Sequence, residues 1–262
     1  MGYINSKINN IIITSCNETH DETSNTAFIN AINDRKYYPI FTYYNCFKPS
    51  NNEILRLKSG DIENRILAGD GLLLEDNSLC SVGFWARNQQ NINYIATAGH
   101  CYEPGSYYLY PWNSTTPAAL IGKIQVHFLE PIDFGLIYIE NNDTKPVPSV
   151  RNSDSERYKE LIIKDIIPVS SNGAHLCFSG LKSHVKCGEK SFRDNIFVAN
   201  FRVIPGDSGG PIFSFKNLTQ VSLNGIAAVS LFDFYDDTNG ITGVITISSL
   251  NTIENLEVVT VP

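Results

Sequence analysis

Short apolar runs dominate the chain from about Leu72 onward, and clusters of Gly, Pro, Asn and Asp separate them. Runs of this length, rich in β-branched and aromatic residues, predict the strands of an all-β sandwich or barrel. No long helical period competes with them. We expect strands at 81–86, 93–98, 123–128, 134–140, 175–179, 197–203, 211–215, 220–231 and 242–247.

The end of the chain has a different pattern. Leu250, Ile253 and Leu256 follow Ser248 at roughly helical spacing, which predicts a short C-terminal helix. A last edge strand would explain the same residues equally well. Both interpretations remain open from the sequence.

Two polar segments divide the chain. The stretch 141–159 contains Pro146, Pro148 and many charges, so we interpret it as a connector between two β-rich halves, at about 66–145 and 155–262. Residues 1–65 are rich in Asn, Ile and Tyr and end in a charged segment at 56–65. We interpret them as a separate N-terminal segment.

Composition excludes several classes of partner. An apolar content of 42% in 262 residues is ample for a packed core. The net charge is −7 and no run is rich in Lys and Arg, so neither nucleic acid nor an anionic membrane is an expected partner. The apolar runs are also far too short to cross a bilayer.

The compartment is harder to determine from the sequence. Residues 1–10 carry one lysine and no long apolar core, which is not a signal peptide, and Gly2 fits the loose myristoylation pattern. Four glycosylation sequons, usable only in a secreted protein, begin at Asn17, Asn113, Asn142 and Asn217. Six cysteines allow about fifteen pairings; they are Cys16, Cys46, Cys80, Cys101, Cys177 and Cys187.

The strongest local motif is Pro-Gly-Asp-Ser-Gly-Gly-Pro at 205–211. A serine becomes a nucleophile when a base takes its proton, and the resulting oxyanion needs hydrogen-bond donors already in place. Gly206 lets the backbone turn so that the amides of Gly206 and Ser208 point at one spot. Taken alone, the motif is equally consistent with an ordinary turn.

A second motif, Thr-Ala-Gly-His-Cys at 97–101, ends a β-type run with a histidine. His100 can act as a general base near neutral pH, and its small neighbour Gly99 leaves the ring accessible. A lone histidine is more often a surface or core residue. The two motifs therefore have to be weighed together.

Together with Leu-Cys-Ser-Val-Gly-Phe at 79–84, the two motifs resemble the chymotrypsin-like serine peptidases. The resemblance is closest to the secreted bacterial branch that includes alpha-lytic protease and the streptogrisins, and it runs from about Ile66 to the C-terminus. It implies two six-stranded antiparallel β-barrels and a secreted, monomeric endopeptidase that cuts protein or peptide substrates. The implied mechanism passes through an acyl-enzyme on Ser208 and needs no cofactor or metal.

The family order of His, Asp and Ser places the catalytic acid between residues 100 and 208. In the family this acid precedes an apolar strand, and Asp133, directly before the apolar run 134–138, fits that pattern. Asp133 would then orient His100. The weaker alternatives, which we interpret as surface charges, are Asp143, Asp154 and Asp165.

The resemblance also implies two disulfides, Cys80 with Cys101 and Cys177 with Cys187. Cys16 and Cys46 lie outside the matched region and are left to pair with each other. A zinc site is the alternative for the second pair, because His175 and His184 stand close to Cys177 and Cys187 in sequence. For these two histidines, and for His20 and His127, a structural or surface role is the default expectation.

The chain departs from the bacterial branch at the specificity pocket, where a bracing cysteine would fall near Arg202. In the wider family this place often forms the pocket floor, so Arg202 would favour an acidic side chain before the scissile bond. An outward-facing strand arginine is the alternative. Ala228 and Ser230 lie in the segment 225–230, which should form a pocket wall where substrate adds as a strand.

The segment Arg-Ile-Leu-Ala-Gly at 65–69 loosely resembles the junction at which family members are cut from their pro-segments. Cleavage there would make 66–262 the mature enzyme and 1–65 a pro-segment remnant. In the animal digestive branch the freed amine, here that of Ile66, would pair with Asp207.

Two other functions fit parts of the sequence: a catalytically inactive protease-like binding or regulatory protein, and a disulfide-rich interaction module. An inactive relative usually loses a member of the triad or the oxyanion glycine. This chain keeps His100, Asp133, Ser208 and Gly206, so the sequence favours an enzyme.

Overall fold

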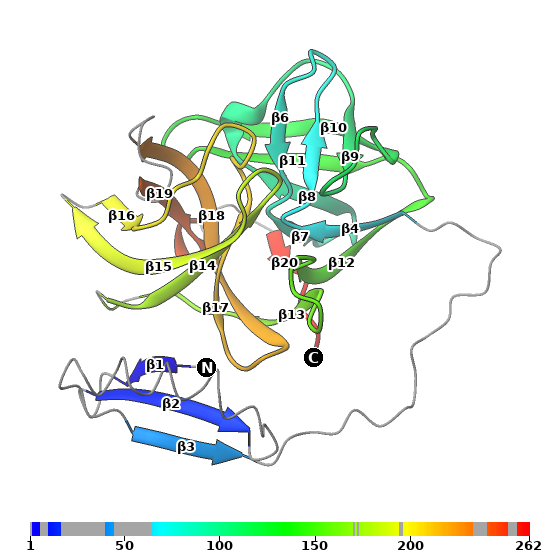
Figure 1. The fold of residues 1–262 in the computed structure, drawn as a ribbon. Coiled ribbons are helices and arrows are strands. Elements are labelled where there is room, and N and C mark those ends of the chain that lie inside the picture. The colour runs from blue at the N-terminus through cyan, green and yellow to red at the C-terminus, as the bar shows by residue number, and fades with distance from the viewer. Residues whose placement is uncertain are drawn as a thin grey trace, which may run out of the picture. The chain divides into compact units, whose positions relative to one another are not determined.

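The computed structural model describes the strands at 2–5, 10–16 and 40–44, and then residues 64–169, 171, 173–193, 196–232, 240–250 and 256–262. The chain divides into two compact units, Met1–Gly60 and Asp61–Pro262. In the first unit, β1 (Gly2–Asn5), β2 (Asn10–Cys16) and β3 (Ile40–Tyr44) form a three-stranded sheet (Figure 1).

The second unit has two halves. The first half is an antiparallel sheet of eight strands in the order β20-β7-β8-β11-β10-β9-β5-β6. Alternating buried residues of these strands form its core, which includes Leu72, Ile95, Leu109 and Ile137. The strands are β5 (Gly71–Leu73), β6 (Leu79–Ser81), β7 (Phe84–Asn88), β8 (Asn93–Thr97), β9 (Tyr107–Tyr110), β10 (Ala119–Phe128), β11 (Phe134–Ile139) and β20 (Leu256–Val258).

The second half contains a closed antiparallel barrel of six strands, because β17 pairs with β14 on one side and with β18 on the other. The barrel order is β17-β14-β15-β16-β19-β18, and β13, β12 and β4 extend the sheet from β18. The strands are β4 (Asn64–Ala68), β12 (Thr144–Arg151), β13 (Glu160–Ile166), β14 (His175–Gly180), β15 (His184–Arg193), β16 (Ile196–Ala199), β17 (Pro211–Phe215), β18 (Gln220–Phe232) and β19 (Gly240–Thr246).

The prediction of an all-β, chymotrypsin-like fold is confirmed, and each expected strand has a counterpart. Among the described strands one six-stranded barrel closes, and the eight-stranded sheet stands where a second six-stranded barrel was expected. The run 81–86 is divided between β6 and β7, and the connector 141–159 contains β12, which two prolines do not prevent from pairing with β4 and β13. At the chain end, Leu250 lies in a helix and Leu256 in a strand, while Ile253 lies outside the described residues. Helix α2 (Ile247–Leu250) makes one turn, and β20 follows as an edge strand on β7.

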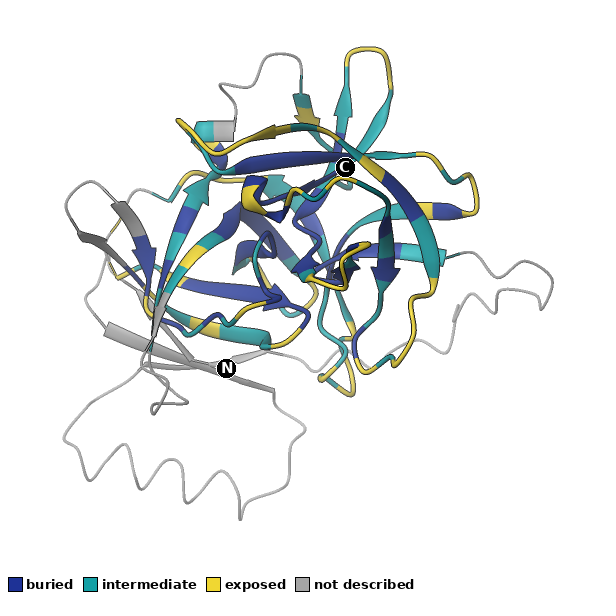
Figure 2. Ribbon diagram, turned by 90° about the horizontal axis from the view of Figure 1, so that it is seen from above, coloured by how far each residue is buried: buried dark blue, intermediate teal, exposed yellow. Residues whose placement is uncertain are grey.

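One buried cluster joins the two halves. It packs Phe84, Phe134 and Leu136 of the first half against Phe213 and Leu223 of the second. Figure 2 shows these buried stretches inside the molecule and the exposed residues mainly on the connecting loops. The C-terminal residues add to the junction, since Val259 N donates to Trp85 O and Val261 N to Ile163 O.

Candidate active site

His100 and Asp133 make two hydrogen bonds with each other. The imidazole Nδ1 lies 2.6 Å from Asp133 Oδ2, and the His100 backbone N–H donates to Asp133 Oδ1 over 2.7 Å. A neutral imidazole that donates from Nδ1 leaves Nε2 as a proton acceptor. The arrangement thus fixes both the tautomer and the ring orientation that a general base needs.

The backbone brings these two residues together at the ends of adjacent strands. His100 lies in the 3₁₀ turn η1 (Gly99–Cys101) directly after β8, and Asp133 directly precedes β11, which pairs with β8. A Cβ at position 99 would collide with the Phe128 carbonyl oxygen, so glycine is required for this close approach. The loop before Asp133 can therefore pass directly beside the histidine turn.

Asp207 holds the turn that carries Ser208. Its fully buried carboxylate accepts hydrogen bonds from Lys182 N at 2.7 Å, Ser183 N at 3.0 Å and Ile204 N at 3.1 Å. Gly206 has a φ of 105°, a left-handed conformation that favours glycine. The turn is thus anchored to the connection between β14 and β15 of the second barrel.

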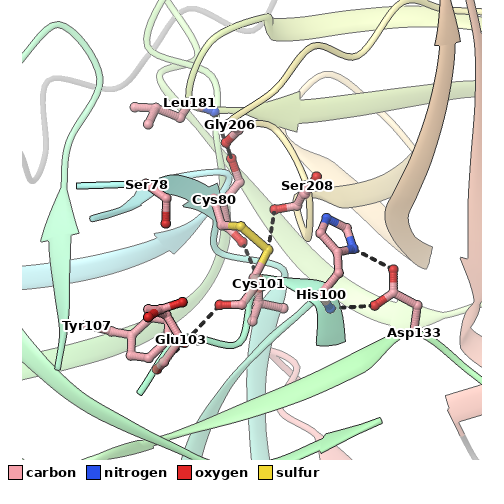
Figure 3. Close-up of a disulfide and its surroundings, with 12 residues drawn as sticks. Ser78, Cys80, His100, Cys101, Glu103, Tyr107, Asp133, Leu181, Gly206 and Ser208 are labelled. Atoms are coloured by element: carbon pink, nitrogen blue, oxygen red, sulfur yellow. Dashed lines mark hydrogen bonds and ion pairs between the residues drawn. A yellow bond between two sulfur atoms is a disulfide. The ribbon is translucent and has the colours of Figure 1, made fainter. Parts of the chain in front are cut away.

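Ser208 lies next to the histidine turn. Its carbonyl oxygen accepts a hydrogen bond from Ser81 N at 2.8 Å and lies 3.8 Å from Cys101 Sγ, on the residue after His100. Figure 3 shows His100, Asp133 and Ser208 gathered around Cys101. Within the described part of the chain, Ser208 Oγ makes no hydrogen bond to His100. The three residues predicted as the triad are nevertheless brought into one place.

The other aspartates lie elsewhere. Asp154 pairs with His184 at 2.8 Å, Asp165 pairs with Lys216, and the backbone carbonyl of Asp143 accepts a hydrogen bond from Asn64 N. Contact with His100 therefore distinguishes Asp133 from them. His127 stacks on Tyr102 and His184 stacks on Trp112, while His20 lies outside the described residues.

Both disulfides that the resemblance implied are present. Cys80–Cys101 ties β6 to the histidine turn, and Cys177–Cys187 joins residues that face each other across β14 and β15. His175 lies close to the second pair, but bonded sulfurs are not thiolate ligands, and His184 is engaged by Asp154. The described geometry therefore favours the disulfide over the zinc alternative. The Cys16 and Cys46 side chains lie outside the described residues.

Tyr107, which the sequence reasoning missed, supports the loop after His100. Its buried hydroxyl donates to Cys101 O at 2.8 Å and accepts from Glu103 N at 2.7 Å (Figure 3). Burial raises the pKa of Tyr107 to about 12, so the hydroxyl stays protonated. Its strand, β9, also lay outside the expected set, because Tyr107 and its neighbours form only a four-residue run.

Arg202 lies beside β19, the strand that pairs with the predicted pocket wall. A Cβ at Gly240 on β19 would lie 2.8 Å from Arg202 Cα, and Thr242 Oγ1 of the same strand donates to Phe201 O. Thr242 in turn pairs with Ser230 of β18, and Ala228 lies at the irregularity in that pairing. Among the described residues the Ser230 hydroxyl has no hydrogen-bond partner.

The predicted cleavage junction lies within a strand. Arg65 belongs to β4 and forms two hydrogen bonds with Glu160, and Ile66 is buried. Asp207, the expected partner of a freed Ile66 amine, already accepts three backbone hydrogen bonds. Cleavage after Arg65 stays a prediction.

No protein-family model matches the chain. In sequence, it is 25% identical over 162 residues to Serine protease 2 of Streptomyces fradiae, a match that covers 57% of this chain and 88% of that protein. In structure, it is similar to Thermobifida fusca Protease A, with a TM-score of 0.60 and 21% identity over 75% of this chain and 100% of the other.

A glutamic acid-specific serine protease has a similar structure too, with a TM-score of 0.60 and 18% identity over 74% of this chain and 100% of the other. These similarities confirm the expected resemblance to bacterial chymotrypsin-like serine peptidases. At this level of identity the structural matches establish the fold.

Proposed function

We propose that this chain, which has the chymotrypsin-like fold of bacterial serine proteases, is a serine endopeptidase with His100, Asp133 and Ser208 as its catalytic triad. Its class, a serine-type peptidase, agrees with its sequence similarity to a Streptomyces serine protease. The observation that carries the triad is the double contact of His100 with Asp133, beside the loop that bears Ser208.

In the first half of the reaction, Ser208 Oγ attacks the carbonyl carbon of the scissile peptide bond, and His100 Nε2 accepts its proton. The protonated imidazole then donates that proton to the leaving amine as the C–N bond breaks. Asp133 stabilises the imidazolium. Water, activated by the same histidine, hydrolyses the resulting ester and restores the Ser208 hydroxyl. The chemistry requires no metal or cofactor.

The backbone amides of Gly206 and Ser208 are the proposed donors to the oxyanion. Two observations support this assignment: the left-handed φ of Gly206 and the three hydrogen bonds that hold the carboxylate of the intervening Asp207. Donors fixed before the reaction lower its barrier because they need not reorganise as charge develops.

The substrate is a protein or peptide that binds along β18. Residues 229–231 pair with β19 on one side, and among the described strands no partner pairs with their other side. An extended peptide can therefore add there as a further strand. Arg202 and the Ser230 hydroxyl would then favour an acidic side chain before the scissile bond, with Ala228 in the wall. The glutamic acid-specific structural relative shares the fold alone and carries no part of this assignment.

We also propose that the protein is secreted and monomeric. Two disulfides in the described part of the chain support an oxidising compartment, because such bonds are rare in the reducing cytosol. None of the helices among the described residues is long and apolar enough to span a membrane.

The test is labelling with a fluorophosphonate probe, comparing the wild-type chain with Ser208→Ala and locating the label by mass spectrometry. We expect label on Ser208 alone, because a neighbouring base is needed to activate it. Replacing Ser208 or His100 by alanine should lower turnover of a peptide substrate about a million-fold.

A failure to label would identify the second candidate function. If neither the intact chain nor a chain cut after Arg65 reacts, the triad is not assembled, and the protein is an inactive, protease-like binding or regulatory protein. Label on a serine other than Ser208 would also overturn the assignment.

A further inference from the structure

We propose that Ser81 positions the oxyanion loop, defined here as residues 206–208, and couples it to β8, the strand that leads to His100. Ser81 lies in β6 of the first half, whereas the loop belongs to the second half. The inference rests on the proposed function, because it assigns Ser81 a role in the same reaction. Ser81 would touch neither substrate nor reacting atoms, so it is a positioning residue.

Ser81 holds both ends of the oxyanion loop. Its backbone N–H donates to Ser208 O over 2.8 Å, and its hydroxyl donates to Gly206 O over 2.9 Å. The same hydroxyl accepts a hydrogen bond from Leu181 N at 3.0 Å. Ser81 is fully buried, so no solvent molecule competes for these bonds. Figure 3 shows Gly206 and Leu181 close together above the disulfide.

These contacts involve the two residues whose amides are the proposed oxyanion donors. The orientation of an amide follows from the backbone around it, so fixing the carbonyls of Gly206 and Ser208 restricts the turn between them. The Asp207 carboxylate restrains the turn from the second barrel. The Ser81 hydroxyl is a side-chain restraint from the first half, and the loop is held between the two.

Ser81 is also tied to the general base. Thr97 Oγ1, on the strand that leads to His100, donates to Ser81 O over 2.9 Å. The neighbouring Cys80 forms the disulfide with Cys101, the residue after His100. One residue therefore links the strand of the base to the loop of the nucleophile. This link fixes the distance between groups that belong to different halves of the fold.

Removing the hydroxyl should impair the transition state more than the bound substrate. In Ser81→Ala, Gly206 O and Leu181 N lose their shared partner, and buried polar groups left in this way favour rearrangement of the turn. Loss of a complete oxyanion donor lowers kcat by about 10²–10³-fold. A donor that is only misaligned should lower kcat less than a donor that is absent. We therefore expect kcat to fall roughly 10- to 100-fold with KM nearly unchanged.

The experiment measures kcat and KM for a peptide substrate, at several pH values, in wild type, Ser81→Ala, Ser81→Thr and Ser179→Ala. Ser179 is the matched control, because its residue is equally buried and its hydroxyl donates to a backbone carbonyl, that of Arg151, rather than to the oxyanion loop. Thr keeps the hydroxyl and should restore most of kcat. The pH profile of Ser81→Ala should match that of wild type, because His100 and Asp133 keep their contacts.

The outcomes separate this inference from the proposed function. If wild type turns over substrate and Ser81→Ala loses no more kcat than Ser179→Ala at equal folded fraction, the positioning role is wrong. A rise in KM with kcat retained, or a displaced pH profile, also overturns it. If Ser81→Ala does not fold, Ser81→Gly removes the same hydroxyl, and the same loss of kcat is required. A wild-type chain without turnover or probe label refutes the proposed function, and with it this role of Ser81.

Discussion

At the scale of single residues, the geometry of His100 depends on one carboxylate that makes two contacts. Asp133 accepts from the ring and from the backbone N–H of the same residue, so rotation of the ring and movement of the turn are both restricted. Half-exposed His100 remains accessible to substrate, whereas Asp133 is more deeply buried. This difference in exposure suits a base that must meet substrate and an acid that must not.

Substrate preference belongs to the same scale. If Arg202 forms the pocket floor, peptide libraries should show cleavage after Glu and Asp, because a guanidinium binds a carboxylate through charge-assisted hydrogen bonds. Arg202→Ala should then lower kcat/KM for acidic substrates by on the order of 10- to 100-fold. Ser230→Ala should reduce it less, since a hydroxyl supplies one neutral hydrogen bond.

The readout is the ratio of kcat/KM for matched peptides that carry Glu or Gln before the scissile bond. A ratio that Arg202→Ala leaves unchanged would mean that Arg202 is an outward-facing strand residue. Fluorophosphonate labelling of Ser208 in the same variant controls for an intact triad.

At the scale of elements, the two disulfides act on different parts of the molecule. Cys177–Cys187 staples the β14–β15 hairpin at opposite positions, 10 residues apart in sequence. Cys80–Cys101 spans 21 residues and connects β6 to the turn that carries His100.

Replacing Cys177 and Cys187 together by alanine should lower the free energy of unfolding by about 2–3 kcal/mol, because a loop of this length is no longer closed in the unfolded chain. Urea unfolding in a Ser208→Ala background, which prevents self-digestion, measures the change. Turnover of the folded double variant should stay close to wild type. A large loss of kcat without loss of stability would contradict this purely structural role.

At the scale of the whole molecule, a buried ion pair lies where the two halves meet. Asp70, in the turn between β4 and β5, is fully buried and pairs with Arg151 at the end of β12. Asp70 also accepts a hydrogen bond from Leu67 N at 2.8 Å. Burial nevertheless raises the pKa of Asp70, because desolvation outweighs the attraction of Arg151.

Arg151→Met should therefore cost about 3 kcal/mol of unfolding free energy at neutral pH, since the buried Asp70 charge loses its partner. A raised carboxyl pKa means that the folded state binds a proton more tightly than the unfolded state. Stability then falls as pH rises above the ordinary value of 3.8. The free energy of unfolding of Arg151→Met should fall more steeply with rising pH than that of wild type. The difference in stability between the two should therefore be smaller in acid.

Arg65→Met is the matched control, because Arg65 pairs with Glu160 at a half-exposed site and should contribute less than about 1 kcal/mol. Urea unfolding of both variants between pH 4 and pH 7, again with Ser208→Ala, tests the difference. Equal losses of unfolding free energy in the two variants would show that Asp70 does not behave as a buried charge. A loss in Arg151→Met that becomes larger in acid would show the same.

The sequence by itself determined the strands with strong local signals and the order of the three motifs at 79–84, 97–101 and 205–211. A short run of apolar residues is a local property, so strands such as 134–140 and 211–215 could be predicted without knowing their neighbours. The glycines around Ser208 and His100 could be recognised in the same way, because the proposed chemistry needs them beside those residues.

Tertiary structure decided what depends on contacts between distant segments. The proline-containing stretch at 144–151 forms a strand because it pairs with β4 and β13, although its local composition is that of a connector. Proximity in space joined Asp133, which the sequence already favoured, to His100 and brought Ser81 to Gly206, 125 positions away in sequence. Such partners cannot be found from local pattern, because hydrogen bonds and burial across the two halves exist only after the strands have paired.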